Sequence, residues 1–364
     1  MKVLALGVLF FAAVLPSLFA QSADMQPLVR IKLNASKPET IFLKELKNRV
    51  ETYKMQTKAE AFSVDDKKQI LEALIDEKLV IQAAAKEGMS ITGTQADQIY
   101  QQAISQMVGK NVTEAEFAEI VKANYKMSVD QLLKSQTGMG LSEYKVYLKN
   151  QVLARNYVLS KKKDEIAKLS EPTDSEIRSY YELKESELVQ PETLKIFIAI
   201  VPKTNDAEAA KARLTKLCSD YKAKKVTDAQ MRAESQKEKS EYKVGDMFIG
   251  KTELAARQLG LPFANLLELF KEKEGFVSDI IENKNEWYFF VISKKYNKKA
   301  LSISDSMQPE STTTVYEYIK NIIGAQKQQR AFLQAIQEVT RELNTPTNVE
   351  RLKKDKDLEK LLNW

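Results

Sequence analysis

Hydrophobic residues recur at helical spacing through most of the first half of the chain. Ser63-Val64-Asp65-Asp66 has the pattern of a helix N-cap with acidic residues in the first turn, and Thr113-Glu114-Ala115-Glu116 repeats it. The apolar positions behind the first cap are Leu71, Leu74, Ile75 and Leu79. Residues 141–159 form a further amphipathic stretch, and the alternating residues 28–33 indicate one short strand. The pattern predicts a mostly helical first half.

The pattern changes in the second half, where strands and helices alternate. A capping box at Thr173-Asp174-Ser175-Glu176 starts a linker helix, and strand-like runs follow at 194–201 and 286–292, with a helix over 206–222. This order predicts a compact α+β domain.

A long helix is predicted over 312–343. Its apolar stripe consists of Val315, Ile319, Ile322, Ile323, Phe332, Ile336 and Val339. A stripe of this length is too apolar to leave in water, and the small α+β domain can cover only part of it. We therefore expect this helix to pack on the first half. The predicted fold class is α+β, mostly helical, with a discontinuous module formed by both ends of the chain around an inserted α+β domain.

The first 20 residues have the pattern of a secretory signal peptide. Lys2 precedes an apolar run from Val3 to Phe19, and Ala20 fits the cleavage site. The alternative, an uncleaved anchor helix, is disfavoured by Pro16 and by the polar residues 21–22; no cysteine stands near the site for a lipid anchor. We expect an exported protein that does not span the membrane after cleavage, with a helical module over 21–188, the α+β domain over 189–298 and a C-terminal helical segment over 299–364.

Composition narrows the possible chemistry. Lysines and acids alternate, so the formal charge of +6 indicates solvated faces and not a nucleic-acid site. The lone Cys218 permits no intramolecular disulfide and fits a buried core thiol better than a reactive one. The absence of histidine from the sequence excludes Ser-His-Asp and Cys-His catalysis and an ordinary zinc site, and there is no Gly-rich phosphate loop. We assign no catalytic residue, metal, nucleotide or other cofactor.

Several segments resemble the SurA/PrsA-type exported chaperones. Residues 70–88 are similar to the signature helix of that family, and residues 171–181 to its linker helix. Residues 261–266 and 275–278 are similar to later landmarks of its parvulin-type prolyl isomerase domain. The resemblance implies a helical chaperone module, completed by the C-terminal helix, around a parvulin-like domain.

The resemblance also identifies a degenerate isomerase pocket. Ile198 and Tyr288 stand where the family has histidines, Asp246 and Met247 lie in what remains of a Gly-Gly-Asp-Leu-Gly motif, and Leu259 and Phe263 correspond to the apolar wall. We expect an inactive or weak domain. Because twisting the amide is the whole barrier to prolyl isomerisation, an active isomerase remains an alternative.

The leading functional hypothesis is a periplasmic, ATP-independent chaperone that holds unfolded or nascent exported polypeptides, with outer-membrane proteins as candidate clients. Such a protein needs an adaptable apolar surface. Candidate client-binding residues are Met107, Tyr125, Met127, Leu133 and Met139, each of which also fits an ordinary helix core. A third hypothesis is an interaction or surface protein with one defined partner.

Overall fold

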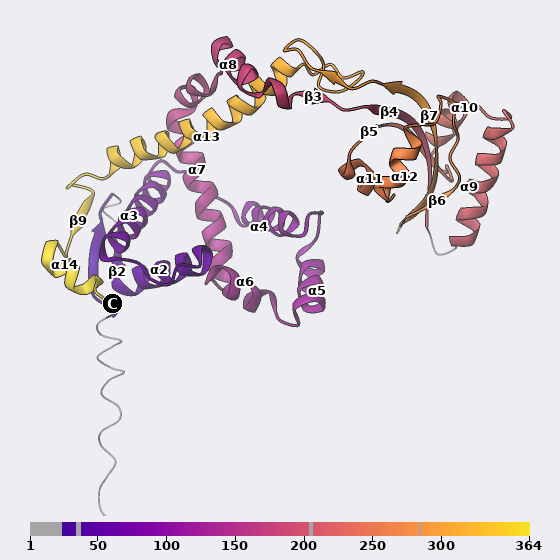
Figure 1. The fold of residues 1–364 in the computed structure, drawn as a ribbon. Coiled ribbons are helices and arrows are strands. Elements are labelled where there is room, and N and C mark those ends of the chain that lie inside the picture. The colour runs from indigo at the N-terminus through magenta and orange to yellow at the C-terminus, as the bar shows by residue number, and fades with distance from the viewer. Residues whose placement is uncertain (1–23, 34–37, 204–206, 284) are drawn as a thin grey trace, which may run out of the picture. The chain divides into compact units, whose positions relative to one another are not determined.

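The computed structural model describes residues 24–33, 38–203, 207–283 and 285–364, which form two compact units (Figure 1). Unit 1 holds the described residues up to Ser170 together with Gln328–Trp364, and unit 2 is Glu171–Lys327. The predicted signal peptide lies outside the described residues. Within the described ranges, none of the helices combines the length and the apolar character that a membrane span requires.

Unit 1 combines a small sheet with a set of helices. Its strands are β1 (Pro27–Ile31), β2 (Glu39–Phe42) and β9 (Val349–Arg351), in the order β2-β1-β9, all antiparallel. Its helices are α2 (Leu43–Thr57), α3 (Val64–Lys86), α4 (Gly93–Val108), α5 (Glu114–Tyr125), α6 (Val129–Thr137), α7 (Leu141–Ser170), α14 (Asp355–Leu362) and the second half of α13 (Val315–Leu343).

Local sequence fixes where several of these helices begin. Ser63 and Thr113, the two caps predicted for this half of the chain, both form complete capping boxes. At the first, the Asp66 amide donates to Ser63 Oγ over 3.1 Å and the Ser63 amide donates back to the Asp66 carboxylate over 2.8 Å. Thr92 and Ser128 form the same arrangement at α4 and α6. Each cap stabilises its helix by about 1 kcal/mol.

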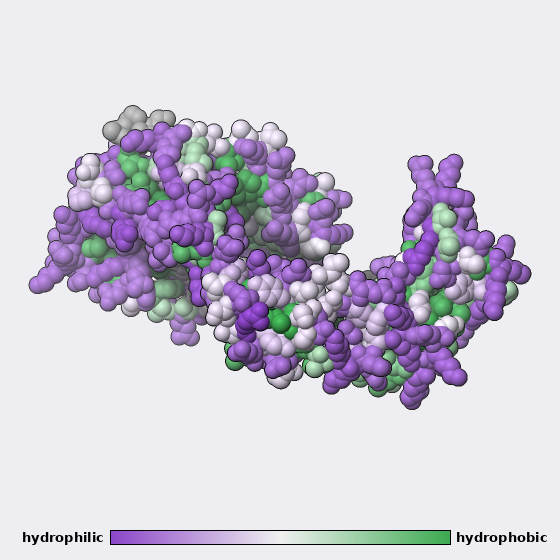
Figure 2. Space-filling model, turned by 90° about the horizontal axis from the view of Figure 1, so that it is seen from above, coloured by the Kyte–Doolittle hydropathy of each residue, from purple (hydrophilic) through white to green (hydrophobic). Residues whose placement is uncertain are grey.

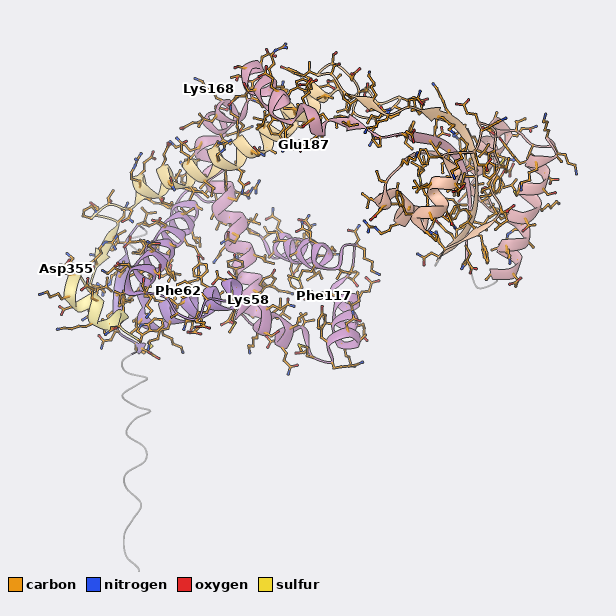
Figure 3. All side chains as sticks on the ribbon, in the orientation of Figure 1. Lys58, Phe62, Phe117, Lys168, Glu187 and Asp355 are labelled. Atoms are coloured by element: carbon orange, nitrogen blue, oxygen red, sulfur yellow. The ribbon has the colours of Figure 1, made fainter. Side chains whose placement is uncertain are left out.

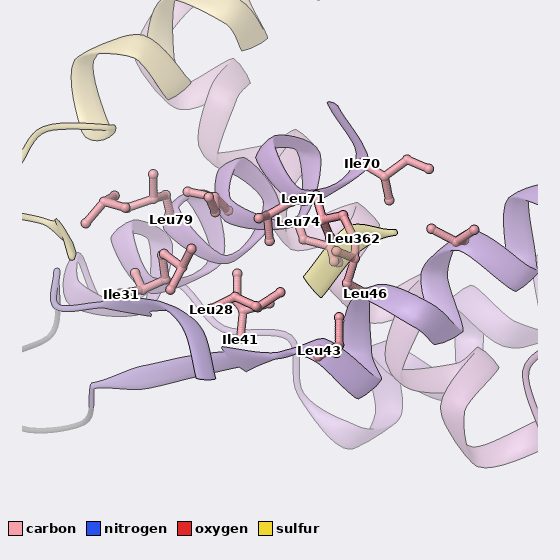
Figure 4. Close-up of a cluster of buried hydrophobic side chains, with 14 residues drawn as sticks. Leu28, Ile31, Ile41, Leu43, Leu46, Ile70, Leu71, Leu74, Leu79 and Leu362 are labelled. Carbon is pink, nitrogen blue, oxygen red and sulfur yellow. The ribbon is translucent and has the colours of Figure 1, made fainter. Parts of the chain in front are cut away.

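One core of unit 1 joins residues from both ends of the chain (Figure 4). Leu28 and Ile31 of β1 are fully buried against Leu74 and Leu79 of α3. Leu362 of α14 is also fully buried in this cluster. The C-terminal segment is therefore part of the same hydrophobic core as the first strand.

The long C-terminal helix α13 contributes to two separate cores. Its later residues Ala331, Ala335 and Val339 are buried with Val80 of α3 and Val158 of α7 in unit 1. Its earlier residues are buried in unit 2, in a cluster with α8 (Asp174–Lys184); the buried members are Ile177, Leu188, Leu301, Val315, Ile319 and Ile323. The expectation that the whole stripe would pack on the first module is therefore wrong for Val315, Ile319 and Ile323, because Ile177, Leu188 and Leu301 bury them within unit 2.

The α+β part of unit 2 is a four-stranded antiparallel sheet in the order β5-β4-β7-β6. Its strands are β4 (Thr193–Pro202), β5 (Lys243–Gly250), β6 (Ile281–Glu282) and β7 (Glu286–Tyr296). Helices α9 (Ala207–Lys222) and α10 (Asp228–Ser235) cover one face, and α11 (Glu253–Leu259) and α12 (Phe263–Leu269) cover the other (Figure 1).

The two strands of a short antiparallel ribbon lie just before and just after this sheet along the chain. β3 (Val189–Gln190) pairs with β8 (Lys299–Ala300), so the chain enters and leaves the α+β part at adjacent positions. Unit 2 extends beyond the domain expected over 189–298, since α8 and the first half of α13 belong to it. The predicted fold class, mostly helical α+β, is confirmed.

Candidate functional site

The positions of the predicted isomerase pocket lie mainly on the sheet face beneath α11 and α12. In the register of β4 with β7, Ile198 pairs with Phe290, and Tyr288 pairs with Ile200. Because successive side chains of a strand alternate between faces, Ile198 and Tyr288 point to the same side. They are 6% and 2% exposed and belong to one buried cluster with Leu259.

The phenol of Tyr288 ties the sheet to α11. Its hydroxyl donates a hydrogen bond to the carbonyl oxygen of Leu259, the last residue of that helix. Burial raises the pKa of Tyr288 to about 12, so the phenol is neutral at physiological pH. At the two positions where the resemblance implies imidazoles, the chain places a buried aliphatic side chain and a phenol that is already hydrogen-bonded.

The remaining pocket residues do not join this buried cluster. Asp246 pairs with Phe197 in the sheet register, which places it on the face of α9 and α10, where it forms an ion pair of 2.5 Å with Arg232. Met247 lies on the α11 and α12 face but is 37% exposed, and Phe263 at the start of α12 is 36% exposed. The structure thus brings together Ile198, Leu259 and Tyr288, and separates Asp246 from them.

Unit 1 contains a cleft that is the better candidate for binding a polypeptide. Its volume is about 470 Å³, and it lies between α2, α3 and the residues from Gly138 into α7. Its apolar and aromatic lining comprises Tyr53, Met55, Leu74, Met139, Val146 and Tyr147. Met55 and Val146 are 49% and 54% exposed. Exposed apolar side chains interrupt the hydrophilic surface of the face shown in Figure 2.

A second cleft of about 350 Å³ shares four lining residues with the first, namely Arg49, Tyr53, Glu77 and Tyr147. It continues along α3 and α7 to Phe332 and Ile336 of α13. The two clefts therefore provide apolar wall on several helices of unit 1.

A charged pair lies where the two clefts meet. Arg49 Nη2 and the Glu77 carboxylate are 2.9 Å apart, and their side chains are 25% and 20% exposed. Burial alone would lower the pKa of Arg49, but the neighbouring Glu77 carboxylate raises it overall, so the guanidinium stays charged. A half-buried pair of this kind supplies donors and acceptors for a peptide backbone without leaving a net charge.

The five predicted client-binding residues have different environments. Met107 on α4 and Tyr125 on α5 are 48% and 52% exposed. Met127 is half-buried and Leu133 fully buried in a core with Phe117 of α5 (Figure 3), so the Leu133 side chain is not accessible in this structure. Met139 lines the 470 Å³ cleft.

Sequence reasoning missed most of the cleft. Tyr53 and Met55 lie in α2, whose apolar residues also follow a helical spacing, but the spacing does not show which turn meets α7. Val146 and Tyr147 fall within the predicted amphipathic stretch, where core and surface residues are interleaved. α2 contains one Tyr and one Met, so its composition gives no clear signal of a cleft.

Comparison with known proteins identifies relatives of this chain. The model of the PPIC-type PPIASE domain family matches residues 172–305. The foldase protein PrsA of Clostridium acetobutylicum is 27% identical over 171 residues, which are 46% of this chain and 45% of the relative, so the match spans about half the length of that curated protein.

Two solved structures are also similar. One comes from a study of PEB4 and the periplasmic protein Cj1289, two SurA-like chaperones of Campylobacter jejuni; it is 17% identical, with a TM-score of 0.36, over 90% of this chain and 100% of that one. PrsA from Bacillus subtilis is 17% identical, with a TM-score of 0.31, over 94% and 99% of the two chains. Residues 172–305 match the PPIC-type PPIASE domain family, and this match together with the similarity to the foldase protein PrsA confirms the predicted resemblance of the chain to the SurA/PrsA-type chaperones.

Proposed function

We propose that the protein is an exported, ATP-independent chaperone of the periplasm that binds unfolded polypeptides and prevents their aggregation, with outer-membrane proteins among its clients. The observation that carries this proposal is the cleft of unit 1, which combines exposed apolar side chains with tyrosines and the Arg49–Glu77 pair. The family match of residues 172–305 and the relationship to a foldase support it.

The composition of the cleft suits a client without fixed sequence. Methionine has three rotatable bonds and a polarisable sulfur, so it adapts to different apolar side chains. Tyrosine offers a large apolar face and a hydroxyl, and its side chain loses little conformational entropy on binding. A cleft of about 470 Å³ is within the size range of small-ligand pockets, which corresponds to a few client side chains at a time.

We assign the binding of unfolded polypeptides to unit 1, and we assign no useful isomerase activity to the parvulin-type domain. The support is the buried cluster of Ile198, Leu259 and Tyr288, which leaves aliphatic carbon and an engaged phenol where the family has imidazoles. An intact apolar pocket could still favour the twisted amide, so the active isomerase is the second candidate function.

The holding proposal is tested by placing a charge on the cleft wall. Val146→Asp puts a carboxylate at a 54% exposed position of the cleft, and a bound apolar client would desolvate this charge. The probe is a fluorescent, permanently unfolded protein such as reduced, carboxymethylated α-lactalbumin. We expect the variant to bind it about tenfold more weakly. Leu333→Asp is the matched control, since Leu333 lies in the middle of α13, is 53% exposed and does not line either of the two clefts described above. Equal binding by both variants would contradict the assignment of the cleft.

The isomerase alternative is tested with the full-length protein and a proline-containing peptide. We expect the cis/trans exchange rate to equal the uncatalysed rate. Acceleration comparable with that of an active parvulin would overturn the inactive-domain proposal and favour the second candidate.

A further inference from the structure

We infer that Met55 and Met139 form a reversible oxidation site, at which a hydroperoxide converts the client cleft from an apolar into a polar surface and so lowers client affinity. This inference rests on the proposed holding function of the cleft. It adds a chemical control of that function which neither the family match nor the relatives imply.

The first observation is the position of the Met55 thioether. Met55 is 49% exposed on α2 and lines the cleft. A Cβ atom added to Gly138 would lie 3.6 Å from Met55 Sδ and 3.0 Å from Thr52 Oγ1. Gly138 ends α6 with φ 75°, a conformation that favours glycine. The sulfur therefore packs over the turn at which α6 ends.

The second observation is that Met139 follows this turn directly. Its side chain is half-buried and lines the same cleft as Met55. Two thioethers, one from α2 and one from the connection between α6 and α7, thus contribute to one apolar wall together with Tyr53 and Tyr147.

The chemistry requires no group beyond the oxidant. The thioether sulfur attacks the peroxide, the O–O bond breaks, one oxygen is transferred to sulfur to form the sulfoxide, and the other leaves as the alcohol or as water. The sulfur loses two electrons and the peroxide gains them. The sulfoxide oxygen is a strong hydrogen-bond acceptor, and apolar client side chains offer it no donor.

The thiol of Cys218 does not compete for the oxidant. It is 5% exposed, and burial raises its pKa, so the reactive thiolate is scarce. Methionine sulfur needs no deprotonation, so exposure decides which methionines react first.

Met25 provides a matched control within the chain. It is 55% exposed, close to the 49% of Met55, but lies just before β1 and does not line the 470 Å³ cleft. It should therefore be oxidised at a similar rate without affecting the wall of the cleft.

The test uses the full-length protein and carboxymethylated α-lactalbumin as the unfolded probe. Hydrogen peroxide is applied and then removed with catalase, and mass spectrometry measures sulfoxide at each methionine. We expect oxidation at Met55 and Met139 to weaken probe binding about tenfold, because a polar oxygen is buried without a partner. Methionine sulfoxide reductases should restore binding.

Three variants separate the possible outcomes. Met55→Leu/Met139→Leu, a volume-conserving change, should have the same affinity for the probe after treatment as before it, since leucine cannot form a sulfoxide. Met25→Leu should lose affinity on treatment as the wild type does. Met55→Gln/Met139→Gln should bind weakly without peroxide. The inference alone is overturned if the wild type is oxidised at both sites but retains its affinity, or if these sites resist oxidation. If the untreated wild type does not bind the probe, the holding function and this inference are both overturned.

Discussion

Tyr288 shows how a single buried side chain can join two elements of the α+β domain. Its hydroxyl is a polar group within an otherwise apolar cluster, and the Leu259 carbonyl is its partner. A buried polar group is tolerated when it is hydrogen-bonded, and it then fixes the elements that it joins. Here the bond holds β7 against the end of α11.

This arrangement predicts a specific alkaline instability. The pKa of Tyr288 is about 12 in the folded protein and near its ordinary value of 10.0 in the unfolded chain, so folding favours the neutral phenol. The resulting stabilisation, about 2–3 kcal/mol, is fully present below pH 10 and is lost as the pH rises through about 12. Tyr288→Phe cannot titrate, so the stability difference between wild type and variant should narrow or reverse over that interval.

Urea unfolding of both proteins at about pH 8 and about pH 12 measures this difference. At the lower pH, Tyr288→Phe should be less stable by about 1–2 kcal/mol, since the buried Leu259 carbonyl loses its donor. Tyr125→Phe, at a 52% exposed position, is the control and should be about as stable as the wild type at about pH 8. A pH-independent gap for Tyr288→Phe would mean that the phenol is not buried as described.

Asp246 and Met247 show what the sequence could have revealed about this pocket. As neighbours on β5 they point to opposite faces of the sheet, so they cannot both line one pocket. The alternation was available from the sequence alone. The hydrogen-bond partner of Tyr288 could not be predicted from the sequence, because Leu259 is 29 residues away and on another element.

At the scale of the element, α13 is one helix with two different sets of partners. Its apolar period was predictable, since Val315, Ile319 and Val339 follow the helical repeat. The change of packing partner between the two halves of α13 was not predictable, because the apolar positions of both halves follow the same helical spacing. The cap at Thr173 predicts where α8 begins, but not that its Ile177 packs against α13.

Substitutions in the two halves should therefore loosen different parts of the protein. Ile319→Ala removes a fully buried side chain from the cluster with Ile177 and should cost about 2–5 kcal/mol. Hydrogen exchange should accelerate in α8 and leave α3 unchanged. Val339→Ala, with a smaller cavity, should instead accelerate exchange in α3 and α7.

Exchange that rises in the same segments for both variants would contradict this division of α13. Leu333→Ala is a suitable control, since that side chain is 53% exposed and its removal should leave exchange unchanged in all of these helices.

At the scale of the molecule, the ribbon of β3 and β8 makes the α+β part a removable insertion. Gln190 and Lys299 are register partners, so their backbones are adjacent. We predict that replacing residues 191–298 by Asn-Gly, which favours a two-residue hairpin turn, leaves a folded protein. Leu188 and Leu301, which anchor the ribbon in the helical cluster, both remain.

This shortened protein should bind the unfolded probe as the full chain does, because the 470 Å³ cleft consists of residues 45–150. Probe affinity and hydrogen exchange in α3 and α7 are the measurements. A folded but non-binding product would mean that the parvulin-type domain holds the client.

The sequence thus predicted the class and order of the elements well and their long-range contacts poorly. Caps such as Ser63 and Thr173 lie within four residues of the groups they satisfy, so a local pattern determines them. The 470 Å³ cleft depends on how α2 packs against α7, about 90 residues later in the chain, and the same helical periodicity permits several such packings.

The pairing of β9 with β1 has a consequence for the order in which the chain can fold. Arg30 and Glu350 are neighbours in this sheet but 320 residues apart in the chain. A chain that emerges from a ribosome at about 5–20 residues per second presents β1 roughly 15–65 seconds before β9. Until then the central strand has one unpaired edge and its core lacks Val349 and Leu362. Among the described residues, the first strand to be made is therefore among the last to be completed.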